Sequence, residues 1–450
     1  MKRFFNRLLE NKTVRKILFF GGIILAFTLF VVVAVIRVEI RNANSPLYIP
    51  EATLPPNDVQ QVVIPQYSNT STQSWANGAV FGTLNKSKIT GVHFVSDFEG
   101  HATGEWTFDG LQCFVDESMI VYIVVEDGVN IDANMDGAFA NLPAATEISG
   151  LKYLNTSKVT SMNDLFKGNK SLTTLDLIFF KTDSLTSAKN MFADCQSLTL
   201  LDMSTMNLQN LLNADGMFKN TYQLAELSLT PMPNVKSMKS MFQEAGNGTL
   251  DGLTIQGEIT MGNCIDATAM FKSSKIKKEH LEQLSTHSLK VAASMFENVS
   301  IYEFDLSKLD MSKVEDASYM FANCQVLTSL NVSGWKTPLL HNTKGMFYNT
   351  YSLTELTIDW TDVEILVDAS DMFNDCTGLV TLDLSAFNNI KIGNANQMFK
   401  RCVRLTTICC NGFVVDVGDT MFKECPKLPS YNSEKISSEM ANTSGYFTSK

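Results

Sequence analysis

Phenylalanine, usually preceded by methionine, returns about every 26 residues from the middle of this chain to its end. A fixed period of roughly 20 to 50 residues indicates a solenoid, in which each unit is too small to bury its own apolar side chains and stacks on its neighbours. The sequence therefore predicts a repeat array that functions through its own surface. The repeated positions are Phe139, Phe166, Phe192, Phe218, Phe242, Phe271, Phe296, Phe321, Phe347, Phe373, Phe399, Phe422 and Phe447.

A polar residue of the type that begins helices stands five places before nearly every one of these phenylalanines. Its side-chain oxygen can accept a hydrogen bond from the first free amides of a helix. We therefore predict a short helix in each unit, with the phenylalanine on its inward face. Only Val291 and Val417 break the column, whose other members are Asn134, Ser161, Ser187, Asn213, Ser237, Asp266, Asp316, Asn342, Asp368, Asn394 and Asn442.

A leucine-rich pattern, L-x-x-L-x-L, follows the phenylalanine in most units. Alternation along a strand places Leu175 and Leu177 in the core and the intervening Asp176 outside. Each coil is thus expected to hold one strand, one turn and one short helix. The predicted fold class is a curved α/β, leucine-rich-repeat-like solenoid with short parallel strands, and about twelve coils spaced by roughly 4.8 Å would span about 55 Å.

Five of the nine cysteines occupy one column, three places after the phenylalanine. Asn169, Thr221 and Thr350 fill the same column in other units. Neighbouring cysteines of stacked coils could approach within disulfide range. We favour small buried thiols instead, because the column also accepts Thr and Asn. The cysteines concerned are Cys195, Cys324, Cys376, Cys402 and Cys425.

The N-terminal segment predicts where the array sits. Residues 17–36 are twenty consecutive uncharged, mostly apolar residues, long enough to cross a hydrocarbon core of roughly 30 Å. Residues 1–16 carry six basic side chains against Glu10 alone, which predicts a cytoplasmic N-terminus and an extracellular repeat domain on a single-pass anchor. A cleaved signal peptide is the alternative, but the apolar stretch is long for one and no small-x-small cleavage site ends it.

Composition divides the rest of the chain. Residues 37–74 are rich in proline and polar residues and are expected to form an extracellular spacer. Residues 75–130 have a β-rich pattern, with the best strands at 89–95 and 119–125, and are expected to cap the N-terminal end of about twelve repeats at 131–429. The shorter, more polar residues 430–450 are expected to cap the other end.

The charge balance excludes one class of partner. Residues 1–42 hold eight Lys and Arg and two Asp and Glu, which leaves 28 basic and 45 acidic residues, a net charge of −17, for the remainder. Such a charge opposes binding to nucleic acid or to an anionic membrane surface.

Catalytic and cofactor signatures are missing from the sequence. The five histidines are scattered, without a H-E-x-x-H or G-x-S-x-G motif and without a C-x-x-C pair. His280 and His287 lie near three lysines in a divergent unit, and we interpret them as part of a surface loop rather than a functional cluster. We predict no enzymatic activity and no cofactor.

Alternation selects one candidate binding face, the outward side of the strands. Its carboxylates suggest calcium, but calcium needs six or more converging oxygens. Solvated side chains that bond the following turn are the favoured interpretation. The candidate residues are Thr174, Asp176, Asp202, Glu226, Glu303, Asp305, Ser329, Asn331, Glu355, Thr357, Thr381 and Asp383.

Three strings carry a family resemblance, namely LNTSKVTSMNDLFKGNKSLTTLDL, LDMSKVEDASYMFANCQVLTSLNVSGW and ASDMFNDCTGLVTLDLSAF. They resemble the repeat of BspA-like leucine-rich repeat surface proteins, the mycoplasma and lactobacillus surface-repeat family, and the resemblance covers about residues 75–450. It implies a bacterial surface protein, of a family in which some members are associated with adhesion to host components or to other cells. The chain departs from the pattern at residues 272–296, where KIKKEHLEQL replaces the strand signal, and no wall-sorting motif is present, so anchoring is expected from the N-terminal span.

Two functional hypotheses follow from these observations. The first is a membrane-anchored binding or adhesion module that contacts an extracellular protein or glycan through many weak contacts along the strand face. The alternative is a structural spacer or a component of a surface assembly that associates with copies of itself.

Overall fold

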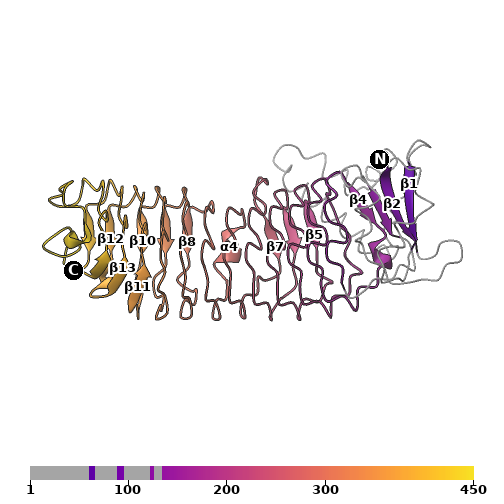
Figure 1. Cartoon of the computed structure of the whole chain (residues 1–450), viewed down its shortest axis with the longest axis horizontal. Coiled ribbons are helices and arrows are strands. Elements are labelled where there is room, and N and C mark those ends of the chain that lie inside the picture. The colour runs from indigo at the N-terminus through magenta and orange to yellow at the C-terminus, as the bar shows by residue number, and fades with distance from the viewer. Residues whose placement is uncertain (1–59, 66–88, 96–121, 126–133, 450) are drawn as a thin grey trace, which may run out of the picture. The chain divides into compact units, whose positions relative to one another are not determined.

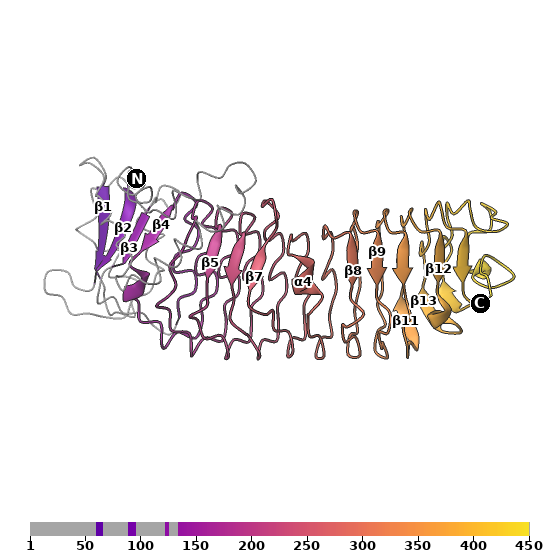
Figure 2. The same ribbon diagram turned by 180° about the vertical axis from the view of Figure 1, so that it is seen from behind.

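The computed structural model describes residues 60–65, 89–95, 122–125 and 134–449. The chain divides into two compact units, Met1–Asp58 and Val59–Lys450, and all described residues belong to the second. Within that unit the chain coils repeatedly, and every pair of named strands runs parallel (Figures 1 and 2). The predicted parallel solenoid is confirmed.

The leucine-rich segments form the first ladder of strands, and the predicted alternation within them is confirmed. In β5 (Leu200–Asp202) only Leu201 is buried, and β6 (Glu226–Ser228), β7 (Thr254–Gln256), β8 (Glu303–Asp305), β9 (Ser329–Asn331), β12 (Thr381–Asp383) and β14 (Thr407–Cys409) likewise bury only their central residue. In β10 (Glu355–Thr357) the central Leu356 is half-buried and packs against the core. The ladder is divided into the groups β5-β6-β7, β8-β9-β10 and β12-β14.

A second ladder occupies the column of polar residues that the sequence assigns to helix starts. Parallel bridges run without a gap from Asn134 through every member of the column to Asp368, and Val291 takes its place among them. Toward the C-terminus the bridges lengthen into a three-stranded sheet of β11 (Ile365–Asp368), β13 (Lys391–Asn394) and β15 (Val414–Val417). Figures 1 and 2 show β11 and β13 in a row separate from β8, β10 and β12.

The predicted short helix in each unit is wrong. The Met-Phe segment is a series of turns, and most coils place residues two before and two after the phenylalanine in the left-handed region, such as Asp164 (φ 53°), Asn190 (φ 52°) and Asp194 (φ 61°). A helix cannot pass through such residues, since every helical residue needs negative φ. The column of polar residues five places before the phenylalanine therefore indicates a turn, and its side-chain oxygens cap that turn.

Backbone hydrogen bonds in this segment run between coils instead of along a helix. The amide of Phe139 donates to Leu165 O at 2.8 Å, the amide of Phe166 donates to Met191 O at 2.8 Å, and the same bond repeats through Phe399, whose amide donates to Met421 O. Each peptide unit before the phenylalanine thus accepts from one coil and donates to the next. An unbroken chain of hydrogen bonds crosses the array, and bonds in such chains reinforce one another.

The phenylalanine side chains form a column parallel to these bonds. Twelve rings, from Phe139 to Phe422, stack with centroids 5.3–5.8 Å apart and interplanar angles of at most 19°. All twelve are buried, as are the methionines that precede most of them. The period of the sequence is therefore the spacing of one continuous aromatic core.

One coil departs from this plan, as the sequence predicts for residues 272–296. Its strand is replaced by the short helix α4 (Lys278–Leu281), which lies between β7 and β8 in sequence and interrupts the first ladder (Figure 1). Two side chains bridge the gap. His280 Nε2 accepts from the Ile255 amide at 3.3 Å, and Glu282 Oε1 accepts from the Asp305 amide at 3.3 Å.

The N-terminal part of this unit continues the first ladder. Strands β1 (Gln60–Pro65), β2 (Ile89–Val95), β3 (Tyr122–Val125) and β4 (Glu147–Ser149) form a parallel sheet in that order, with η4 (Leu151–Tyr153) next. Strands β2 and β3 confirm the two segments chosen from the sequence. Strand β1 lies in the stretch that the sequence assigns to the spacer.

The last residues fold back onto the array. The structure places η5 (Ser385–Phe387) beside the strands and η6 (Ser438–Met440) near the end. Phe447 does not extend the stack, because Phe447 and Tyr446 both meet Phe422 edge-on, at 6.0 and 5.1 Å. Ile436 O accepts the Phe422 amide at 2.9 Å and so ends the hydrogen-bond chain.

Within residues 60–65, 89–95, 122–125 and 134–449, no helix is both long and apolar enough to cross a membrane. The span predicted at residues 17–36 lies outside these residues.

Candidate binding faces

The strand face presents its side chains in aligned rows. In the sheet of β8, β9 and β10, Glu303, Ser329 and Glu355 are register partners, and Asp305, Asn331 and Thr357 form the parallel row. The central residues of these strands point inward, so the row residues face out, where they are exposed or half-buried. Six of the twelve predicted residues thus come together on one continuous surface.

The other six predicted residues lie in two further groups. Asp202 and Glu226 belong to β5 and β6, where Asp202 pairs with Ser228 and Glu226 pairs with Leu200. Thr174 and Asp176 are exposed in the coil before β5. Thr381 and Asp383 pair with Thr407 and Cys409 of β14. The coil of α4 separates the group at β5–β7 from the group at β8–β10, so the twelve residues do not form one uninterrupted face.

The outward acidic and amide side chains also bond the turn that follows each strand, as the sequence predicts. Asp176, Asp202, Asp305, Asn331 and Asp383 each accept the amide two residues later through Oδ1, at 2.9–3.1 Å. Hydrogen bonds from the side chain and then the backbone amide of Ser307 lower the pKa of Asp305. These oxygens stabilise their own turns. Among the described residues, no group of three or more His, Cys, Asp or Glu side chains is placed to hold a metal ion.

The second ladder uses its polar column in the same way. Where the column holds Asn or Asp, the side chain accepts the amide two residues on, as Asn213 does from Asp215 at 2.8 Å. Where the column holds Ser187, the amide two residues later donates instead to Asn163 of the preceding coil, at 2.9 Å. Val417, which breaks the polar column, shows the same arrangement as Ser187, because the amide two residues later, that of Asp419, donates to Asn396 at 2.9 Å.

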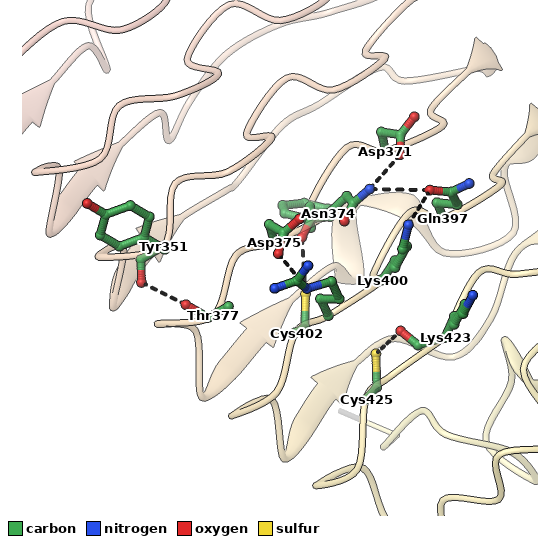
Figure 3. A network of polar contacts seen from close by, with 12 residues as sticks. Tyr351, Asp371, Asn374, Asp375, Thr377, Gln397, Lys400, Cys402, Lys423 and Cys425 are labelled. Atoms are coloured by element: carbon green, nitrogen blue, oxygen red, sulfur yellow. Dashed lines mark hydrogen bonds and ion pairs between the residues drawn. The ribbon is translucent and has the colours of Figure 1, made fainter.

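Side chains along the edge of the Met-Phe turns bond to neighbouring coils (Figure 3). Asn374 Nδ2 donates to Asp371 of its own coil at 2.7 Å and to Gln397 Oε1 of the next coil at 3.5 Å. Arg401 pairs with Asp375 at 2.9 Å. The contacts between coils hold adjacent coils in register, so the side chains at this edge have a structural role.

The cysteine column has a structural role, and all eight cysteines in the described part of the chain are free thiols. The thiols of Cys195, Cys324, Cys376, Cys402 and Cys425 donate to the phenylalanine carbonyl of the preceding coil, at 2.8–3.2 Å. Asn169 donates to the corresponding Phe139 carbonyl at 2.8 Å. The preference for buried thiols over disulfides is confirmed. Burial raises the pKa of Cys195, Cys324, Cys376 and Cys425 to about 12.

The histidines of the divergent coil also have structural partners. Burial lowers the pKa of His280, which keeps the ring neutral and able to accept the Ile255 amide. Lys275 donates to the carbonyls of Thr249 and Leu250 at 2.9 and 2.7 Å, and His287 Nδ1 lies 3.3 Å from Ser285 Oγ. His280 and His287 therefore serve this coil and its neighbours.

The outward side of the β11-β13-β15 sheet is a surface that the sequence reasoning missed. It carries three exposed apolar side chains, 52–61% accessible: Ile365, Val367 and Val414. The signal was present in the sequence, since Ile365-Leu366-Val367 and Phe413-Val414-Val415 are unbroken apolar runs. Such runs are typical of strands covered on both faces.

Comparisons with known proteins give a family and several similar structures. Solved structures similar to this chain include a leucine-rich repeat protein from Bacteroides ovatus (16% identity, 80% of this chain and 92% of that one, TM-score 0.43). A leucine-rich cell surface protein from Faecalibacterium prausnitzii is also similar (15% identity, 84% of this chain and 90% of that one, TM-score 0.37). No curated protein matches the sequence.

The profile of one family matches residues 133–253, 265–379 and 327–437, together nearly two thirds of the chain. The match begins at the first Met-Phe coil and ends near the C-terminal turn. It confirms the resemblance to the mycoplasma surface-repeat family. The chain belongs to the DUF285 family, described as Mycoplasma protein of unknown function.

Proposed function

We propose that this protein is a membrane-anchored surface module that binds an extracellular protein or glycan through its strand face. The observation that carries the proposal is the pair of polar rows on β8, β9 and β10, Glu303-Ser329-Glu355 and Asp305-Asn331-Thr357. Rows of carboxylates, hydroxyls and amides offer repeated hydrogen-bonding groups at the spacing of adjacent strands. Sugars and extended polypeptides both present partners at a comparable repeat.

The physical basis of such binding is the sum of many weak contacts. Each exposed polar group gains little alone, because it exchanges a bond with water for a bond with the partner. A rigid array reduces the cost of ordering the surface, since the strands hold the side chains in place before the partner arrives. The acidic character of the rows favours partners with basic groups or abundant hydroxyl donors.

The proposed location rests on the sequence. An N-terminal span at residues 17–36 with its larger positive flank at residues 1–16 would place the repeats outside the cell. This arrangement would keep the module at the membrane while its strand face contacts the surroundings.

The test is binding of the full chain, purified in mild detergent, to an array of matrix proteins, mammalian glycans and bacterial wall polysaccharides at physiological salt, with and without calcium. We expect saturable binding that falls at least tenfold in the double variant Glu303→Lys/Glu355→Lys. The matched control is Glu434→Lys/Glu439→Lys, which makes the same charge change at exposed residues of the C-terminal turn. Absence of saturable binding, or an equal loss in the control, would contradict the proposal.

A further inference from the structure

The coil of α4 is continuous with its neighbours along the second ladder and the phenylalanine column. Parallel bridges join Val291 of this coil to Asp266 before it and Asp316 after it. The ring of Phe296 stacks on the preceding phenylalanine and on the following one, at 5.7 Å each. In the first ladder, by contrast, a helix takes the place of the strand between β7 and β8 (Figures 1 and 2). The two sides of this coil are therefore held to the array in different ways.

On the strand side, two side chains take over the part that backbone groups play elsewhere. Neighbouring strands such as β6 and β7, or β8 and β9, pair through their backbones. At α4 the Ile255 amide of β7 donates to His280 Nε2, and the Asp305 amide of β8 donates to Glu282 Oε1, both at 3.3 Å. These contacts are longer than the roughly 2.9 Å of an ordinary backbone hydrogen bond. The first ladder thus depends here on side chains that can change their protonation state.

His280 can accept the Ile255 amide only while its ring is neutral. A neutral imidazole has one acceptor nitrogen, whereas both nitrogens of the protonated ring are donors. Protonation would therefore set Nε2–H of His280 against the amide of Ile255. Burial lowers the pKa of His280, so the neutral ring is favoured near pH 7 and the protonated ring forms on acidification.

The charged groups around His280 do not reverse this behaviour. After burial, Glu279 raises its pKa and Lys277 lowers it. Strand β7 (Thr254–Gln256) contains no titratable side chain. Glu282 keeps an acceptor oxygen even when protonated, so its contact survives an acidification that breaks the His280 contact. The titratable side chains of this coil and of β8 are Lys275, Lys277, Lys278, Glu279, Glu282, His287, Glu303 and Asp305.

We propose that the coil of α4 is an acid-sensitive hinge, in which protonation of His280 releases the Ile255 amide and opens the first ladder between β7 and α4. The second ladder and the phenylalanine column form the axis, because the contacts there are between backbone groups that do not titrate. The Phe271 amide, for example, donates to Met295 O at 3.0 Å. Opening changes the angle between the strands β5–β7 and the strands β8–β10. The hinge does not require ligand binding, because it uses the contacts of this coil alone.

A backbone contact sets the limit of the opening. Just before β7, the Leu253 amide donates to Lys275 O at 2.7 Å, and this bond does not depend on pH. Leu281 of α4 is fully buried and keeps the helix on the core. The released segment therefore begins at residue 254, and the coil as a whole stays folded.

The test is hydrogen exchange of the full chain in mild detergent at pH 7.5 and pH 5.0, read by mass spectrometry and corrected for the intrinsic rate at each pH. We expect the protection of the peptide 254–258 to fall at least tenfold at pH 5.0, while the peptides 267–273 and 290–297 keep theirs. His280→Gln should abolish this response, because an amide oxygen accepts at both pH values. The matched control is His287→Gln in the same coil, which should keep the response.

A further variant separates the histidine from its acidic neighbour. Glu282→Gln keeps an acceptor without a titratable group and should respond to acid as the wild-type chain does. Equal protection of 254–258 at both pH values in the wild-type chain, an equal loss in 267–273 and 290–297, or a response that persists in His280→Gln would overturn the proposal.

The wild-type chain also provides a measurement that needs no variant to fold. The histidine rings can be titrated by NMR in the chain labelled at histidine Cε1. We expect one ring to titrate with the same midpoint as the loss of protection in 254–258. Protection lost at a pH where no ring titrates would show that another group controls the opening and would overturn the hinge proposed for His280.

Discussion

The thiol of Cys402 donates a hydrogen bond to the carbonyl oxygen of Phe373 in the preceding coil, at 3.1 Å (Figure 3 shows the thiol). The same bond recurs wherever this column holds cysteine, and it links the side chain of one coil to the backbone of another. Burial raises the pKa of Cys402 well above its ordinary value, so the thiol remains a protonated donor. Its role is that of a buried polar group satisfied by its neighbour.

Thiol reactivity should follow this burial. At pH 8 in the native state, we expect an alkylating reagent to modify Cys409, which is half-exposed, well before Cys195, Cys324, Cys376, Cys402 and Cys425. The reason is that reaction needs an accessible thiolate, and these five are neither accessible nor ionised. Peptide mass mapping after a short exposure measures the order. Early modification of the buried column would contradict it, and the same mapping in denaturant provides the control.

Alkaline pH should destabilise the array. The folded pKa of Cys195 is about 12 against an ordinary value of 9.0, so the unfolded chain ionises first as pH rises. The contribution of the Cys195 thiol to the free energy of unfolding is therefore fully present below pH 9.0 and is lost as the pH rises from 9.0 to about 12. Urea titrations at pH 8 and pH 10.5 measure the loss. Cys195→Thr should show a smaller decline than the wild-type chain, and an equal decline would count against this explanation.

Truncation of the aromatic column should be costly at its centre. Phe321→Ala removes a fully buried ring that stacks at 5.7 Å on both Phe296 and Phe347. We expect a loss of about 3–5 kcal/mol in the free energy of unfolding, from lost burial and the cavity left behind. The control is Tyr302→Ala at a side chain 67% exposed, with an expected effect of about 0.5 kcal/mol or less. Similar urea midpoints for the two variants would show that the column does not hold the coils together.

Two glycines with similar backbone angles should respond differently to alanine. Gly252 (φ 79°) has no room for a Cβ atom, which would lie 2.3 Å from the backbone oxygen of Lys275 in the next coil. Gly334 (φ 73°) has no atom within 4 Å of that position. Gly334→Ala should cost about 1–2 kcal/mol, the penalty of a left-handed alanine, and Gly252→Ala should cost clearly more. Thermal unfolding compares them, and equal midpoints would show that the coils are not in close contact here.

Ala269 offers a stabilising substitution. It holds φ 54° at the turn position that Asn190 occupies three coils earlier, and asparagine tolerates this conformation better than alanine. Ala269→Asn should raise the free energy of unfolding by about 0.5–1 kcal/mol. Ala293, which accepts the Ala269 amide at 2.8 Å, provides the control, because Ala293→Asn gains no such relief. A loss of stability in Ala269→Asn would show that the turn conformation is not set by the backbone.

The sequence by itself determined the periodic core of this protein. Three features follow from which side chains must be buried: the spacing between the phenylalanines, the alternation around Leu201 and its equivalents, and the interruption at α4. The structure confirms each of them. The role of Asp202 and Asp305 in the turns after their strands also follows from local geometry, since the bond spans only two residues.

Only the tertiary structure decided how the Met-Phe segment closes its hydrogen bonds. A polar residue before an apolar one signals a first free amide equally well for a helix and for a turn, and the choice depends on where the remaining amides find acceptors. Here the amide of Phe139 reaches Leu165 O in the next coil, a partner 26 residues away. The β11-β13-β15 sheet could not be predicted from the sequence for the same reason. Its strands lie in different coils, so Ile365, Lys391 and Val414 share a face only after the coils have stacked.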